Sequence, residues 1–241
     1  MTHGSLFSGI GGFDLGFERA GIKTIWQVEI DAYCRRVLER RFPDTIRFTD
    51  IRECGVGNLS PVDILSGGFP CQDISHAGKR AGIDGERSGL WSEYARIIRE
   101  LRPRYVVVEN VSALLVRGME RVLGDLAACG YNAEWESIRA SDVGAPHRRE
   151  RVWILAYPEC EPTGWWSNGS EWGQRCSQES SRNGWTGRGI ENDWWTVEPN
   201  VGRVAHGIPS RVDRLRGLGN AIIPQIAQLI AEKILEYEGA R

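Results

Sequence analysis

The chain has 241 residues, 41% of them hydrophobic, which suits one α/β domain with a full core. It has no run of about eighteen apolar residues, and its first apolar cluster is too short and glycine-rich for a signal peptide, so we expect a cytoplasmic protein without membrane contact. The formal net charge of -2 is not typical of a nucleic-acid-binding protein. However, only Lys23, Lys79 and Lys233 are lysines among the 30 basic residues, and all the others are arginines, which suit bidentate contacts with phosphates and guanine.

The first 156 residues alternate short apolar runs with helical patterns. The apolar runs predict strands at 6–7, 24–28, 46–48, 62–65, 105–108 and 152–156. Helical patterns lie between them at 13–20, 32–42, 91–101 and 119–129, and each ends at a glycine or near a proline. This alternation predicts a doubly wound, mostly parallel sheet of the α/β class.

The composition changes after residue 157. Residues 158–200 are rich in Gly, Ser and Asn and hold six of the ten tryptophans, without an aliphatic period. They predict a small irregular insertion, and so many aromatic residues favour a recognition loop over plain disorder. Residues 224–237 then predict a last helix with proline at its first position, packed back on the main domain.

A glycine turn follows the first predicted strand. Ligands of doubly wound sheets bind outside the carboxyl ends of the strands, where the backbone of Gly9, Gly11 and Gly12 can approach a ligand closely. The dinucleotide fingerprint would need a glycine at position 14, where Asp14 stands. This difference disfavours a pyrophosphate and favours a cofactor without phosphate.

Acidic residues follow the second and third predicted strands. Glu29 stands about twenty residues beyond the glycine turn, the spacing at which an acidic side chain accepts hydrogen bonds from ribose hydroxyls. Asp50 and Ile51 place an acceptor beside an apolar surface, which suits the amino group and ring of adenine. The alternative interpretations are an exposed glutamate and a turn aspartate.

A cysteine and a glutamate follow the fourth and fifth predicted strands. Buried cysteines usually fill space, but Cys71 comes after a stiff Gly-Gly-Phe-Pro turn that should direct its thiol to the cleft. The six cysteines contain no CxxC pair, so we expect reduced thiols and neither a metal site nor a disulfide framework. Glu109 is costly to bury unless protonated or paired, so a raised pKa and a role as proton donor are expected.

Seven motifs in order resemble those of cytosine-C5 DNA methyltransferases of the bacterial and phage type. They are FSGIGG (7–12), Glu29, Asp50-Ile51, GGFPCQ (67–72), ENV (109–111), HRRERVW (147–153) and GLGNAIIP (217–224). Each alone is weak or moderate, whereas the ordered set is specific. One departure is His147, where the family usually has glutamine. The resemblance implies a Rossmann-like fold and a DNA (cytosine-5-)-methyltransferase that uses S-adenosylmethionine.

The resemblance also implies the site. The Cys71 thiolate would add to carbon 6 of a flipped-out cytosine, Glu109 would act on N3, and Arg149 and Arg151, two residues apart on a strand, would meet the base carbonyl and a phosphate. The residues expected to bind the cofactor are Phe7, Gly9, Gly11, Gly12, Glu29, Asp50, Ile51 and Asn220. The glycine-rich loop 72–91 would close over DNA as a lid.

The organisation expected from the family has three parts. Residues 1–156 form the catalytic and cofactor-binding domain, 157–205 a short target-recognition region, and 206–241 a return segment with the last helix on the catalytic domain. The residues expected to contact double-stranded DNA are Gln72, Ser75, Arg175, Arg182 and Arg188. We expect a monomer whose cognate restriction endonuclease is encoded separately.

Three alternative functions stay open at the level of sequence. A tRNA cytosine-C5 methyltransferase of the same fold would share the PCQ and ENV motifs. A nicotinamide oxidoreductase would share the sheet, although Asp14 argues against it. A catalytically silent DNA-binding module is disfavoured because Cys71, Glu109 and both arginines of the HRRER motif are present.

Overall fold

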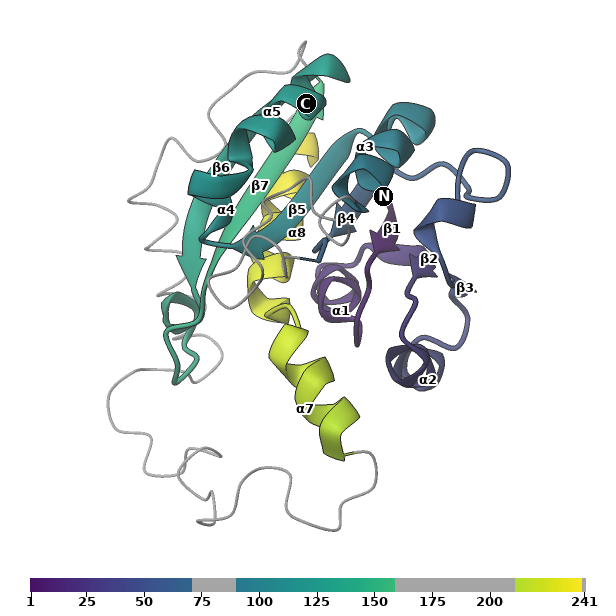
Figure 1. Ribbon diagram of the computed structural model, residues 1–241, viewed down its shortest axis with the longest axis vertical. Helices are drawn as coiled ribbons and strands as arrows, with labels where there is room; N and C mark the ends of the chain where they lie inside the picture. Colours follow the sequence, from purple (N-terminus) through teal and green to yellow (C-terminus); the bar gives the residue numbers. More distant parts are fainter. Residues whose placement is uncertain (71–89, 159–210, 240–241) are drawn as a thin grey trace.

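The computed structural model describes residues 1–70, 90–158 and 211–239, which form helices around one sheet (Figure 1). The strands are β1 (Thr2–Leu6), β2 (Lys23–Val28), β3 (Ile46–Phe48), β4 (Ile64–Gly67), β5 (Tyr105–Val111), β6 (Tyr131–Arg139) and β7 (Glu150–Pro158). The helices are α1 (Gly12–Arg19), α2 (Ala32–Arg41), α3 (Leu90–Leu101), α4 (Leu114–Arg117), α5 (Met119–Ala128), α7 (Arg211–Asn220) and α8 (Pro224–Gly239), with short 3-10 helices η1 (Ile51–Glu53) and η2 (Ala140–Val143).

The seven strands of the described residues follow the order β3-β2-β1-β4-β5-β7-β6. Strands β1 to β5 are parallel, whereas β7 runs antiparallel to both β5 and β6. The predicted doubly wound, mostly parallel sheet is therefore confirmed. The inner strands read as continuous apolar runs because helices cover both faces, as in β5, where Tyr105 to Val108 are fully buried.

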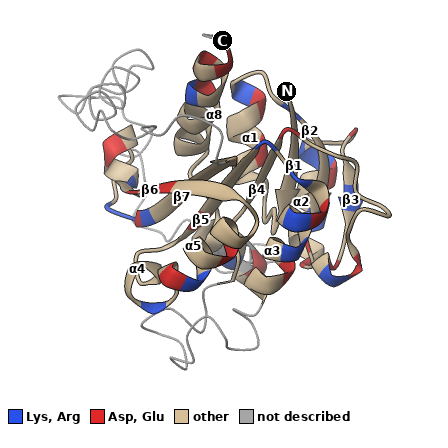
Figure 2. Ribbon diagram, turned by 90° about the horizontal axis from the view of Figure 1, so that it is seen from above, with Lys and Arg blue, Asp and Glu red and all other residues tan. Residues whose placement is uncertain are grey.

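Two apolar clusters cover the two faces of the sheet. One face packs against α3 and α5 through residues such as Trp91, Ile98 and Val122, and the other packs against α1 and α8 through residues such as Phe17 and Ile230. The residues coloured as charged in Figure 2 gather on the outer helices, such as α2, α3 and α5. This division explains the amphipathic patterns of these helices.

Helix α8 packs closely on α1 because α1 carries a glycine at the contact. A Cβ atom at Gly16 would lie 2.5 Å from the Pro224 carbonyl oxygen and 2.6 Å from the Ala227 Cβ. The end of the described chain thereby becomes part of the core beside the first strand.

The structure differs from the sequence-based expectation in several elements. Strand β1 ends at Leu6, and Phe7 lies beyond it with a φ of 52°. Strand β6 was not expected, because it is an edge strand in which polar residues interrupt the apolar ones. Helix α7 was also not expected, since it contains Gly217 and Gly219, which lower helix propensity.

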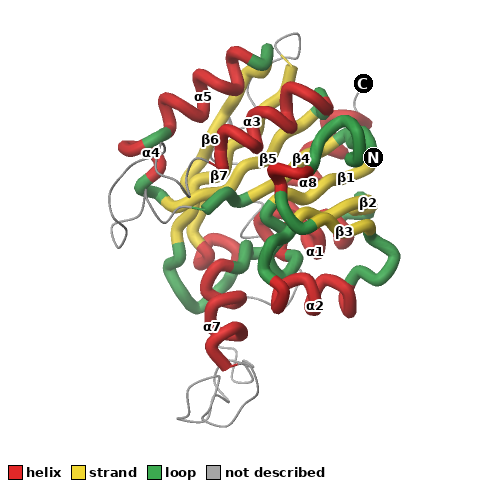
Figure 3. The backbone as a smooth tube through the Cα atoms, turned by 45° about the vertical axis from the view of Figure 1, so that its right-hand side comes forward, coloured by secondary structure: helices red, strands yellow, loops and turns green. Residues whose placement is uncertain are grey.

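Figure 3 shows α7 beyond the strand ends and apart from α3 and α5. No helix among the described residues has the length and apolar character needed to cross a membrane.

Candidate active site

A cavity of about 290 Å³ lies at the carboxyl ends of the parallel strands, close to the lower limit of roughly 300 Å³ common for small-molecule sites. Segments that follow β1, β2, β3 and β4 line it, together with β5, the start of β7 and α7. The sequence-predicted residues that line it are Phe7, Gly9, Glu29, Asp50, Ile51, Glu109, Arg149, Arg151 and Asn220. Residues separated by more than 200 positions in the chain thus meet at one cavity.

The glycine turn after β1 uses its amides internally. The Gly9 N–H donates to Oε2 of Glu29 at 2.7 Å, and the Gly11 N–H donates to the Ser8 carbonyl oxygen at 2.9 Å. A pyrophosphate at such a turn needs free backbone amides. The occupied amides support the expectation of a cofactor without phosphate at this position.

Gly11 and Gly12 are not among the residues that line the cavity. A Cβ atom at Gly11 would lie 2.6 Å from Cε2 of Phe42, and one at Gly12 would lie 2.7 Å from the Ile222 carbonyl oxygen. Gly11 also has a φ of 89°, which favours glycine. Both positions therefore require glycine for close packing, and the structure does not bring them to the cavity wall.

Glu29 is held in a fixed orientation at the end of β2. Its Oε2 accepts from Gly9 and its Oε1 accepts the Asp31 N–H, each at 2.7 Å. Burial raises the pKa of Glu29, while these two backbone hydrogen bonds oppose the shift. Each carboxylate oxygen keeps a further lone pair, so the group can still accept from a pair of hydroxyls.

Asp50 and Ile51 lie at the start of η1, after β3. Asp50 caps η1 by accepting the Arg52 N–H at 3.0 Å and pairs with the Arg52 guanidinium at 2.5 Å. These hydrogen bonds lower the pKa of Asp50, which keeps an ionised acceptor beside the buried Ile51. Ile30, which sequence reasoning missed, also lines the cavity and is 63% exposed, so it adds a second apolar surface.

Glu109 lies inside β5 rather than after its end, because β5 continues to Val111 by pairing with β7. Its side chain is buried, and Oε1 lies 3.1 Å from Nε of Arg151. Burial raises the pKa of Glu109, and the charges of Arg151 and Arg149 oppose that shift. A buried carboxyl with a raised pKa can hold a proton for a ligand in the cavity.

The turn after β4 passes directly beside Glu109. A Cβ atom at Gly68 would lie 2.9 Å from Oε2 of Glu109, so glycine lets the turn approach the carboxyl. The amide of Asn110 donates to the Phe69 carbonyl oxygen at 3.2 Å and fixes the turn to β5. Gly68, Phe69 and Pro70 all line the cavity.

Arg149 immediately precedes β7, whereas Arg151 lies within the strand. The Arg149 carbonyl oxygen accepts the Ala140 N–H at 2.8 Å, which holds this segment against η2. His147 is exposed, and its Nδ1 accepts the Arg149 N–H at 3.4 Å. Both arginines reach the cavity wall from the side opposite Glu29 and Asp50 in the sheet order.

Asn220 is the last residue of α7 and lines the cavity with Arg216. Arg216 pairs with Asp31 at 3.4 Å, which connects α7 to the start of α2. Sequence reasoning missed both residues of this pair. Asp31 had a usable signal, since it directly precedes the predicted helix and caps α2 by accepting from Tyr33 and Cys34. Arg216 had none, because its helix was not expected.

Several predicted site residues lie outside the described residues. They are Cys71, Gln72, Ser75, Arg175, Arg182 and Arg188. Residues 72–89 of the expected lid and residues 159–205 of the expected target-recognition region also lie outside the described residues.

Known proteins with similar sequences are bacterial methyltransferases. The type II methyltransferase M.NgoFVII of Neisseria gonorrhoeae is 34% identical over 157 residues, covering 63% of this chain and 42% of the relative. M2.BsuMI of Bacillus subtilis (strain 168), also a type II methyltransferase, is 38% identical over 160 residues, covering 63% and 41%. The chain thus spans less than half the length of these relatives.

Solved structures with the same fold are also methyltransferases. A protein from an E. coli prophage, assigned as a DNA modification methyltransferase, has a TM-score of 0.57 and 26% identity over 66% of this chain and 47% of its own. The Dnmt2 methyltransferase of S. pombe has a TM-score of 0.57 at 20% identity, covering 68% and 53%, and supports the fold alone.

The family model described as C-5 cytosine-specific DNA methylase matches residues 1–181, which include the glycine turn, the PCQ motif, Glu109 and both cavity arginines. The resemblance carried by the ordered motifs is confirmed, and this chain belongs to the C-5 cytosine-specific DNA methylase family.

Proposed function

We propose that this chain is a DNA (cytosine-5-)-methyltransferase that acts on a cytosine flipped out of a specific duplex sequence. The observation that carries the proposal is the buried Glu109, paired with Arg151, in the same cavity as Glu29 and the Asp50-Ile51 pair. The cavity thus combines a proton donor for a base with acceptors for a nucleoside. S-adenosylmethionine, when bound, supplies an electrophilic methyl group on a sulfonium.

The residues at the glycine turn and η1 fit this cofactor. Glu29 would accept from the ribose hydroxyls, Asp50 from the adenine amino group, and Ile51 and Ile30 would contact the ring. The amides of Gly9 and Gly11 already have acceptors within the protein, which disfavours the pyrophosphate of a nicotinamide dinucleotide. Asn220 would close the cavity from the end of α7.

The proposed reaction begins with Cys71. Its thiolate forms a bond to carbon 6 of cytosine, the electron pair of the 5,6 double bond makes carbon 5 nucleophilic, and Glu109 donates a proton to N3. After methyl transfer, which would leave S-adenosylhomocysteine, a base takes the carbon-5 proton and the thiolate leaves carbon 6, which restores the 5,6 double bond. The N3 proton returns to Glu109. The target must leave the helix, since stacking blocks both faces of the ring.

The arginines would hold the base and the acid. Arg151 fixes the Glu109 carboxyl through its Nε contact, and Arg149 with Arg151 would meet the base carbonyl and a backbone phosphate. We also propose that Gln72, Ser75 and the residues of the 157–205 region contact duplex DNA. The type II methyltransferase relatives support a partner restriction endonuclease encoded separately, and we propose a cytoplasmic monomer.

Incubation with radiolabelled S-adenosylmethionine tests the proposal. Duplex DNA should become labelled, and bisulfite sequencing should place 5-methylcytosine in one short sequence. Label on tRNA but not on DNA would favour the tRNA methyltransferase alternative. DNA retention without any methyl transfer would instead indicate a silent binding module.

A further inference from the structure

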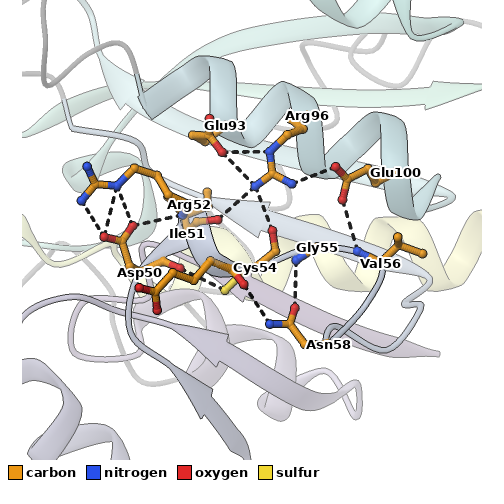
Figure 4. A network of polar contacts seen from close by, with 11 residues as sticks. Asp50, Ile51, Arg52, Cys54, Gly55, Val56, Asn58, Glu93, Arg96 and Glu100 are labelled. Atoms are coloured by element: carbon orange, nitrogen blue, oxygen red, sulfur yellow. Dashed lines mark hydrogen bonds and ion pairs between the residues drawn. The ribbon is translucent and has the colours of Figure 1, made fainter.

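Arg96, on α3, connects this helix to the backbone of the η1 segment (Figure 4). Its Nη2 donates to the carbonyl oxygens of Ile51 at 3.1 Å and Cys54 at 2.8 Å. The side chain is 29% exposed and is not among the residues that line the cavity. Arg96 therefore acts on the segment after β3 from behind the cavity wall.

Two acids on α3 hold the guanidinium in place. Arg96 pairs with Glu93 and with Glu100, each at 2.8 Å. Glu100 also accepts the Val56 N–H at 3.2 Å through its other oxygen. Because both acids lie one turn away on the same helix, the planar guanidinium has little freedom to rotate away from the two carbonyls.

The peptide unit that Arg96 contacts also orients Asp50. The Ile51 carbonyl accepts from Arg96, and the N–H of the same peptide unit, which belongs to Arg52, donates to Oδ1 of Asp50 at 3.0 Å. A peptide unit is planar, so fixing its oxygen also fixes the direction of its N–H. Chains of hydrogen bonds of this kind strengthen one another.

The η1 segment receives little support from the sheet. Strand β3 has three residues and lies at the sheet edge, where it pairs only with β2 among the described strands. The buried side chains of Ile51 and Cys54 pack in the core cluster of α3, and within the segment the Cys54 N–H donates to the Ile51 carbonyl oxygen at 3.1 Å. Arg96 adds a second donor to that carbonyl oxygen and ties it to α3.

We propose that Arg96 is a positioning residue for the adenine end of the cofactor site. This inference rests on the proposed function, since it requires Asp50 and Ile51 to receive adenine. Arg96 helps to fix the Ile51–Arg52 peptide, and this peptide orients the Asp50 carboxylate together with the Arg52 guanidinium. The carboxylate then accepts from the adenine amino group. Loss of Arg96 leaves the cavity lined by the same side chains but loosens the acceptor.

Calorimetry with two nucleosides tests the inference without turnover. S-adenosylhomocysteine carries the amino group, whereas S-inosylhomocysteine carries a carbonyl oxygen at that position. We expect the wild-type chain to prefer the adenine compound and Arg96→Met to lose about tenfold in affinity for it, comparable to one charge-assisted hydrogen bond. Affinity for the inosine compound should change little, so the preference should fall.

Two further variants separate positioning from stability. Arg121→Met removes another arginine that pairs with an acid four residues away, on α5 at 2.7 Å, and should leave both affinities unchanged. Arg96→Lys keeps a charge for Glu93 and Glu100 but cannot reproduce the planar contact, so it should lose the same preference with a smaller fall in the unfolding temperature.

An Arg96→Met chain that keeps the wild-type preference for S-adenosylhomocysteine over S-inosylhomocysteine would overturn the inference. An equal loss of affinity for both compounds would also overturn it, because that result indicates a purely structural role. If Arg96→Met does not fold, Arg96→Lys decides by the same criterion. A wild-type chain that binds neither nucleoside would contradict the proposed function itself. A wild-type chain that binds, with an unchanged preference in the variants, contradicts only the role of Arg96.

Discussion

Nε of Arg151 lies 3.1 Å from Oε1 of Glu109, and the two residues belong to adjacent antiparallel strands, β7 and β5. Burial raises the pKa of Glu109, and the arginine opposes the shift without removing it. A carboxyl in this state holds its proton to a higher pH than a free glutamate does, while its orientation stays fixed by the pair. The two strands therefore place an acid and its orienting cation side by side, facing the cavity.

Glu109→Gln should remove the carboxyl that donates the proton to N3 while nearly keeping the shape of the side chain. We expect kcat to fall by about 10²- to 10⁴-fold, the usual contribution of a general acid, with little change in cofactor affinity. Single-turnover methylation and calorimetry measure the two effects separately. A variant that keeps more than half of the wild-type rate constant would exclude Glu109 as the proton donor.

Cys71→Ala should abolish methyl transfer, and Cys71→Ser should nearly do so, because only a thiolate is nucleophilic enough for the addition. Cofactor binding should survive in both. With 5-fluorocytosine in the target sequence, the wild-type chain should stay covalently attached to DNA, since fluorine cannot leave as a proton does. Denaturing electrophoresis detects this adduct, and its absence with normal DNA still methylated would contradict the addition route.

The sequence predicted the sheet and most of the cavity because both leave local signals. Strand β5 is a continuous apolar run, and Glu29 and Glu109 interrupt the pattern at or near strand ends. Strand β6 left no such signal, since its polar residues suit an edge. The Arg96 contacts with η1 could not be predicted, because they join residues more than 40 positions apart through backbone carbonyls that have no sequence signature.

Asp14 should make the stability of the fold depend on pH. It is fully buried on α1, where it accepts hydrogen bonds from Ser5 and Gln27, and burial raises its pKa from 3.8 to about 6. Because the raised pKa favours the protonated folded state, its stabilising contribution is complete below about pH 4 and is lost as the pH rises through about 6.

Asp14→Asn removes this titration. The free energy of unfolding of the variant minus that of wild type should therefore rise by on the order of 2–3 kcal/mol as the pH goes from 4 to 7. Urea unfolding at a series of pH values measures this difference. The buried His3, whose pKa burial lowers to about 3, produces the opposite slope below pH 6.5, but it is present in both proteins and cancels in the difference. Parallel stability curves for the two proteins would show that Asp14 does not titrate in this range.

The contact between α1 and α8 should tolerate no side chain at Gly16. Gly16→Ala places its Cβ 2.5 Å from the Pro224 carbonyl oxygen and 2.6 Å from the Ala227 Cβ, so the helices must separate. We expect a loss of about 1–3 kcal/mol in the free energy of unfolding. Gly124→Ala, on α5 with no neighbour within 4 Å, is the matched control and should gain about 0.5–1 kcal/mol from helix propensity. Thermal unfolding of both variants gives the comparison. Helix α8 begins shortly after Gly217 and Asn220, which line the cavity, so a shift of α8 should also disturb the cavity. The Gly16 variant should therefore bind the cofactor more weakly, whereas the Gly124 variant should not.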